Sequence, residues 1–165
     1  MKLQKTNHKE REQMIKEIVH VGITVSNLEQ AKHFYGEVLG LKFVGQLTME
    51  GEETDILFGR PNSKARVAYF NGANEGIVAP PVELIEFTQQ DVEACQADLF
   101  RTSISEICFG VDDIDLAYRH LVDCGVECLS KPQTFDFTTD GFAKSKALYF
   151  KDPDGNILEL MQIVK

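Results

Sequence analysis

The stretch VHVGITVSNLE at residues 19–29 has a second copy, SEICFGVDDID, at residues 105–115. Both copies run through apolar residues to a valine, continue with a polar turn, and then show Leu or Ile followed by an acid. Helical spacing of apolar residues follows each copy, in segments that end at glycine, 28–40 and 114–125. A strand and a helix that occur twice predict a fold of two similar modules.

Strand patterns occupy most of the remaining sequence in each half. In the first half there are four, LKFVGQLTM, TDILFG, ARVAYF and PPVELIEF, one more than the three strands that follow the helix in a βαβββ module. In the second half FDFTTDGFAKSKALYF predicts two strands around a glycine turn, and KDPDGNILELMQI predicts a tight turn and a final strand. We therefore predict an α+β fold of two βαβββ modules. The predicted parts are a polar helical extension at 1–17, the first module at 18–88, a linker at 89–103 and the second module at 104–165.

The composition limits the class of protein and its partners. A chain of 165 residues with 43 % hydrophobic residues fits one compact domain with a substantial core. The net charge of −9 argues against nucleic acid and anionic membranes as partners, because both require clustered basic residues. The N-terminus has no signal-peptide pattern, and no stretch approaches the roughly 20 apolar residues of a membrane-spanning helix. We predict a cytoplasmic protein.

On one face of the predicted strands, titratable residues lie among apolar ones. Residues alternate between the two faces of a strand, so the last-strand glutamates share a face with large apolar residues, such as Ile85 beside Glu83. An unpaired charge in such surroundings costs several kcal/mol, and a shared cation would remove that cost. Each half carries one such residue early and one late: His20 and Glu83 in the first half, Glu106 and Glu159 in the second.

At these motifs the chain resembles the vicinal oxygen chelate superfamily, which includes glyoxalase I, methylmalonyl-CoA epimerase, extradiol dioxygenases and the bleomycin and fosfomycin resistance proteins. The resemblance covers nearly everything after Glu17. Its most specific motifs are HVGITVSNLEQAKHFYGEVLGLKF, VELIEF, VDDIDLAYRHLVDCGV and LYFKDPDGNILEL.

The resemblance implies that the two βαβββ modules form a curved half-barrel cleft. It also implies that four side chains, from the first and last strands of the two modules, bind one divalent metal ion in that cleft. By position they are His20, Glu83, Glu106 and Glu159. Such an oxygen-rich set favours Mn²⁺, Mg²⁺, Co²⁺, Ni²⁺ or Ca²⁺ over Zn²⁺. Two other interpretations concern single residues: Glu106 marks a lost site and only hydrogen-bonds His20, or Glu86 competes with Glu83.

The resemblance further implies a metal-dependent isomerase or lyase of the glyoxalase type. It would act on a small carbonyl substrate with adjacent oxygens, by proton abstraction and enediolate stabilisation. Glu159 is the expected base, and Glu83 is expected to share that role. A metal-free protein that binds a drug or another small ligand is one alternative. A ring-cleaving dioxygenase is another, although the triad of two histidines and one carboxylate is missing. We expect a homodimer, as is frequent in the family.

The four cysteines, Cys95, Cys108, Cys124 and Cys128, form no CxxC pair. In a cytoplasmic protein they are expected to be reduced packing residues rather than disulfides or zinc ligands.

All four thiols should therefore be free. Titration of the denatured protein with a thiol reagent, in the absence of reductant, should count four thiols per chain. A count of two or fewer would show that the protein matures in an oxidising compartment.

Overall fold

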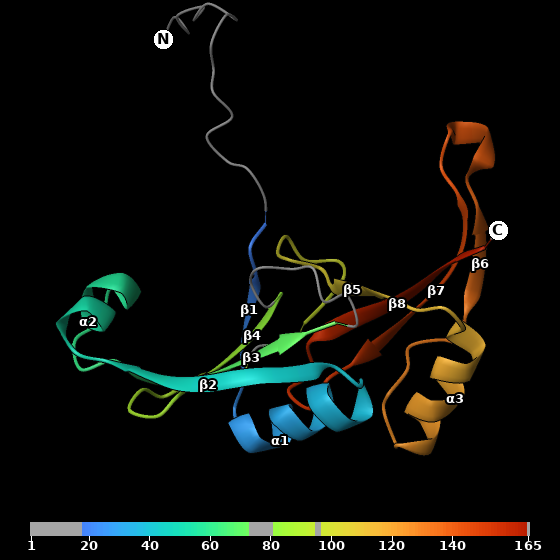
Figure 1. The fold of residues 1–165 in the computed structure, drawn as a ribbon. Helices are drawn as coiled ribbons and strands as arrows, with labels where there is room; N and C mark the ends of the chain where they lie inside the picture. Colours follow the sequence, from blue (N-terminus) through green and yellow to red (C-terminus); the bar gives the residue numbers. More distant parts are fainter. Residues whose placement is uncertain (1–17, 73–80, 95–96, 165) are drawn as a thin grey trace, which may run out of the picture.

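Two four-stranded sheets, one from each half of the chain, make up the framework (Figure 1). This computed structural model describes residues 18–72, 81–94 and 97–164, so the predicted helical extension at 1–17 lies outside the described residues. The first sheet contains β1 (Val21–Thr24), β2 (Lys42–Glu50), β3 (Lys64–Asn71) and β4 (Val82–Phe87). The second contains β5 (Ile107–Gly110), β6 (Gln133–Asp136), β7 (Lys144–Lys151) and β8 (Ile157–Val164).

The strand order is the same in both sheets. It is β1-β4-β3-β2 in the first and β5-β8-β7-β6 in the second. The first strand of each module pairs in parallel with the last strand, and the other neighbours are antiparallel. β1 and β5, which carry the repeated motif, therefore occupy equivalent places. This confirms the predicted α+β fold of two repeated modules.

One helix after each first strand covers the sheets from the same side. α1 (Leu28–His33) continues into a π-helical turn at Phe34–Val38, and α3 (Ile114–Asp123) is its counterpart. The side chain of Asn27 accepts a hydrogen bond from the backbone of Gln30 at 3.0 Å, and Asp113 accepts one from Leu116 at 2.9 Å. Asn27 and Asp113 are thus the N-cap residues of the two helices. Figure 1 shows α1 and α3 under the two sheets.

The segment TDILFG forms a helix, so the predicted strand was wrong. α2 (Glu52–Phe58) begins after Gly51 and ends at Gly59, whose φ of 67° closes a helix in the left-handed conformation. Glu52, Glu53 and Asp55 lie in its first turn, where the helix dipole favours negative charge. A short apolar run is compatible with either structure, and these end signals favour the helix.

A single core extends across both modules between the sheets and the two helices. Its members are apolar residues of β1, β3, β4, α1 and the π-helical turn, together with residues of α3, β7 and β8 from the other half. Alternation predicts that Val19, Val21, Ile23 and Val25 share the apolar face of the first strand, and this holds at its end, where Ile23 is 7 % and Val25 is 1 % exposed while Thr24 is exposed. It does not hold at Val19, which precedes β1 and is 50 % exposed. No helix in the described part of the chain is long and apolar enough to cross a membrane.

The DPDGN turn at 152–156 joins the second module to the first. The Asp152 carboxylate is buried and accepts hydrogen bonds from the Asn156 backbone at 2.8 Å and from the Tyr35 hydroxyl at 2.9 Å. The Ser26 backbone donates to both carboxylate oxygens of Asp154 at 3.1 and 3.2 Å. The turn was predicted from its sequence, and the structure adds that it fixes the arrangement of the modules.

Cys108, Cys124 and Cys128 are free thiols. Cys95 lies outside the described residues, so the expectation of four free thiols stays a prediction.

Tyr35→Phe should destabilise the protein, because it removes the buried hydrogen bond from the Tyr35 hydroxyl to Asp152 Oδ2 and leaves that oxygen with only the Asn156 side-chain amide as donor. We expect the free energy of unfolding to fall by about 1–3 kcal/mol, measured by urea denaturation. Tyr118→Phe is the matched control, since no hydrogen bond from its hydroxyl to another described residue is observed. Equal losses in the two variants would show that Asp152 does not depend on Tyr35.

Candidate functional site

His20, Glu83 and Tyr69 meet on the face of the first sheet that is turned away from α1. The His20 Nε2 atom lies 3.2 Å from Glu83 Oε2, and the Tyr69 hydroxyl donates to Glu83 Oε1 at 2.8 Å. Tyr69 is the direct cross-strand neighbour of Glu83. The pKa of Tyr69 is raised to about 12, mainly by burial and secondly by the hydrogen bond to Glu83. The phenol therefore stays a donor at neutral pH. Both oxygens of Glu83 are thus held by the protein.

The second module repeats this arrangement with different side chains. Tyr149 is the cross-strand neighbour of Glu159, as Tyr69 is of Glu83. Burial, followed by the charges of Glu159 and Glu106, raises the pKa of Tyr149. Both carboxylates therefore lie close to the same phenol.

Cys108 is the neighbour of Glu159 on β5. Burial, followed by interaction with the Glu159 carboxylate, raises the pKa of the Cys108 thiol to about 12. The thiol is therefore protonated at neutral pH and is not a nucleophile in this state.

Glu83 and Glu159 are each only 9 % exposed, although both side chains are ionisable. Within the described part of the chain, the only basic side chain within 4.0 Å of Glu83 is His20, and Glu159 has none. Glu86, the competitor of Glu83, lies on the helix side instead. It accepts a hydrogen bond from the Leu28 backbone at 3.1 Å and pairs with Arg66. This leaves Glu83 as the carboxylate on the open face.

Of the four predicted ligands, His20 and Glu83 are in direct contact. The charges of Glu106 and Glu159 both act on Tyr149, but no direct contact between the two carboxylates is observed in the described structure. No three His, Cys, Asp or Glu side chains among residues 18–72, 81–94 and 97–164 form a group that could hold a metal ion. The chemistry of the donor set, one imidazole and three carboxylates, nevertheless fits a divalent cation. That all four bind one ion stays a prediction.

Sequence reasoning missed Tyr69, Tyr149 and Cys108. Their strands were predicted, but the register between strands was not, and the register alone decides which side chain lies beside each glutamate. The one signal in the sequence is the spacing of two residues between Glu106 and Cys108, which places both on the same face of a strand.

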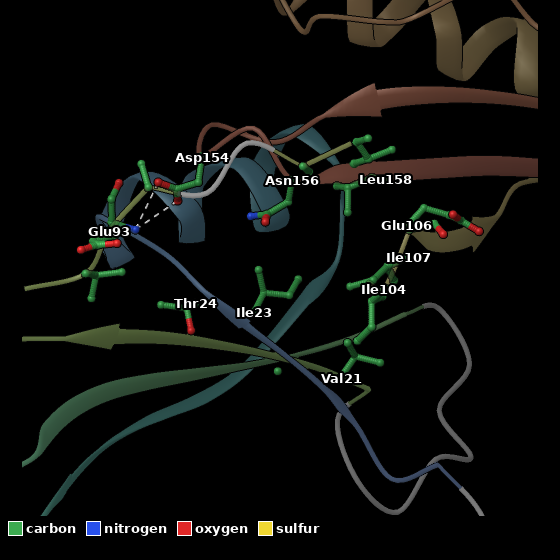
Figure 2. Close-up of a pocket in the computed structure, with 17 residues that line it drawn as sticks. Val21, Ile23, Thr24, Glu93, Ile104, Glu106, Ile107, Asp154, Asn156 and Leu158 are labelled. Carbon is green, nitrogen blue, oxygen red and sulfur yellow. Dashed lines mark hydrogen bonds between the residues drawn. The ribbon is translucent and has the colours of Figure 1, made fainter. Parts of the chain in front are cut away.

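A cavity of about 320 Å³ lies where the two modules meet (Figure 2). It borders β1 on one side and the segments leading into β5 and β8 on the other. Glu106 is one of its lining residues, so the cavity adjoins one of the four predicted ligands.

Glu159→Gln should increase the reactivity of Cys108. Removal of the neighbouring negative charge lowers the pKa of the thiol, so alkylation by iodoacetamide at pH 8 should become roughly threefold faster or more. Peptide mapping by mass spectrometry gives the rate at each cysteine. Cys124, at the end of α3, is the internal control and should react equally in both proteins; an unchanged rate at Cys108 would contradict the contact.

Comparison with known proteins gives a consistent result. The chain is 26 % identical over 153 residues to the uncharacterized protein YaeR of Escherichia coli strain K12. The matched region covers 90 % of this chain and 97 % of YaeR. It is 26 % identical over 149 residues to metallothiol transferase FosB of Shouchella clausii, covering 89 % and 80 % of the two chains. The crystal structure of a glyoxalase family protein from Bacillus cereus superposes with a TM-score of 0.79 at 19 % identity, over 94 % of this chain and 99 % of that one. The family model for the Glyoxalase/Bleomycin resistance protein/Dioxygenase superfamily matches residues 17–160, and the chain therefore belongs to this superfamily, which it resembles in its motifs.

Proposed function

We propose that the protein is a divalent-metal-dependent isomerase or lyase of the glyoxalase type. It would remove a proton from a carbon atom next to the carbonyl group of a small substrate with adjacent oxygens. The observation that carries this proposal is the pair Glu83 and Glu159. Both carboxylates are almost fully buried at equivalent places in the two modules, and neither has a Lys or Arg partner among the described residues.

His20, Glu83, Glu106 and Glu159 are the residues that would hold the metal. Three carboxylates favour Mn²⁺, Mg²⁺, Co²⁺, Ni²⁺ or Ca²⁺ over Zn²⁺. A bound divalent ion acts as a Lewis acid on substrate oxygens and so stabilises the negative charge left after proton removal.

Glu159 is the better candidate for the base. Both oxygens of Glu83 are engaged, one with His20 and one with the Tyr69 hydroxyl. Glu159 has no salt-bridge partner in the described chain, so its carboxylate has capacity left to accept a proton. Tyr149, beside it, carries a hydroxyl that can orient either the carboxylate or a substrate oxygen.

Metal-dependent thiol transfer is a second candidate. It is favoured by the similarity to the metallothiol transferase FosB over most of both chains. Activity of the metal-loaded protein on fosfomycin plus a thiol, compared with activity on the adduct of a 2-oxoaldehyde and glutathione, separates the two candidates. A protein that binds no metal would instead support the drug-binding alternative.

We also propose that the protein is a cytoplasmic homodimer with a small-molecule substrate. Large apolar side chains on α2 and near the β6–β7 turn support a second copy as partner, because Ile56 and Phe142 are both 73 % exposed. Light scattering coupled to size-exclusion chromatography measures the mass of the assembly.

Metal titration by calorimetry tests the site. Wild type, freed of metal by a chelator, should bind one divalent ion per set of four ligands, and binding should raise the melting temperature. Glu106→Ala should weaken the affinity for the metal by roughly tenfold or more. Loss of a residue that only hydrogen-bonds a metal ligand already costs roughly tenfold. Glu159→Gln should abolish turnover more completely than it weakens metal binding, because this residue is also the proposed base.

Glu53→Ala is the matched control, since it removes an exposed carboxylate on α2. Its affinity should equal that of wild type. Equal affinity in wild type and Glu106→Ala would show that Glu106 is not a ligand. Absence of any metal binding would refute the proposed enzyme.

A further inference from the structure

We propose that the cavity between the modules binds the uncharged, apolar part of the ligand, and that it discriminates against anions. This inference names the substrate class of the proposed function and rests on that function only for the reacting oxygens. The occupant would be a ring or branched chain that carries a neutral carbonyl or hydroxyl group.

The position of the cavity makes it a binding site for part of a molecule. Among residues 18–72, 81–94 and 97–164, β1 pairs only with β4 and β5 pairs only with β8, so the described part of each sheet has a free strand edge near the cavity. The cavity adjoins one of these edges, because it is lined by successive residues of β1 from Val21 to Thr24. Backbone groups on a free edge can hydrogen-bond a neutral oxygen of a ligand.

The walls of the cavity are mainly aliphatic. They include Val21, Ile23, Ile104, Ile107 and Leu158 (Figure 2). An engineered aliphatic cavity of about 150 Å³ is enough to hold benzene. The volume of about 320 Å³ found here is therefore sufficient for a substituted aromatic ring or a branched alkyl group.

The charges around the cavity have one sign. No Lys, Arg or His occurs among the described residues that line it, whereas Glu93, Glu106 and Asp154 do. Both oxygens of Asp154 accept hydrogen bonds from Ser26, which keeps this carboxylate in place. A carboxylate or phosphonate bound here would lose water without gaining a cation and would be repelled by like charges.

Two ligands of nearly equal size test the proposal: neutral 2-hydroxyacetophenone and anionic mandelate. Each has a phenyl ring and two adjacent oxygens. Affinities are measured by ligand-observed NMR titration, first with chelator-treated protein and then with protein loaded with Mg²⁺ in the absence of Mn²⁺. The neutral ligand should bind about tenfold more tightly than mandelate or better, already without metal, because the apolar cavity does not require the ion.

Ile104 allows substitutions with little risk to folding, since its side chain is 79 % exposed and lies at the mouth of the cavity. Ile104→Trp should obstruct the mouth of the cavity and weaken the affinity for 2-hydroxyacetophenone by roughly fivefold or more. Ile104→Lys should weaken binding of the neutral ligand and strengthen binding of mandelate, so that the ratio of the two affinities falls by about tenfold. Leu57→Lys, on α2 outside the cavity, is the control and should leave both affinities unchanged.

Thermal unfolding of each variant establishes that it is folded before affinities are compared. If wild type without metal bound mandelate as tightly as 2-hydroxyacetophenone, or more tightly, the proposal would be overturned. Failure of 2-hydroxyacetophenone to bind at millimolar concentration would also overturn it. Affinities that do not respond to either change at Ile104 would place the ligand elsewhere and also overturn it. The metal titration described above is independent of these outcomes, so it shows separately whether the proposed function fails.

Discussion

The hydrogen bond from the Tyr35 hydroxyl to the Asp152 carboxylate joins the two modules at a point closed to water. The same carboxylate holds the turn before β8 through the backbone of Asn156. One buried group therefore fixes both the helical segment that follows β1 and the strand that carries Glu159. The spacing of the two free strand edges, and with it the shape of the cavity between them, depends on this contact outside the candidate site. Loss of the contact would act on the site through the placement of β8 rather than through any ligand.

Much of this fold could be predicted because two periodicities agree along the chain. Alternation in the strands places Ile23 and Val25 in the core and leaves His20 on the open face. Helical spacing then supplies the apolar sides of α1 and α3, which cover the opposite face of the sheets. The same alternation identified Glu83 and Glu159 as unusual, since a charge on a buried face requires a partner. The structure bears out their burial, whereas convergence on one ion depends on spatial relations between modules that periodicity does not contain.

The residues missed by sequence reasoning are those whose roles depend on register or on helix ends. Tyr69 and Tyr149 lie beside their glutamates only because β3 and β7 pair with the last strands in one particular alignment. α2 was mistaken for a strand because its apolar run is short, and the glycines and acidic residues at its ends decide its structure. Asp152 was assigned to a tight turn, correctly, but its contact with Tyr35 spans most of the chain and has no local signature.

The two modules share a backbone plan, yet their open faces differ in a way that divides the chemistry. In the first, Gly22 is adjacent to Glu83 and Ile85, and a Cβ atom there would lie 3.3 Å from each of their side chains. That close approach fits the paired state of His20 and Glu83. In the second, the equivalent place is taken by Cys108, and Glu106 replaces the histidine, so the negative charges of Glu106 and Glu159 have no basic partner in the described chain. We therefore propose that both the binding of a cation and the acceptance of a proton depend mainly on the second module. A duplicated module would permit this division, because one copy holds its glutamate between His20 and Tyr69 while the other has carboxylates without a basic partner in the described chain.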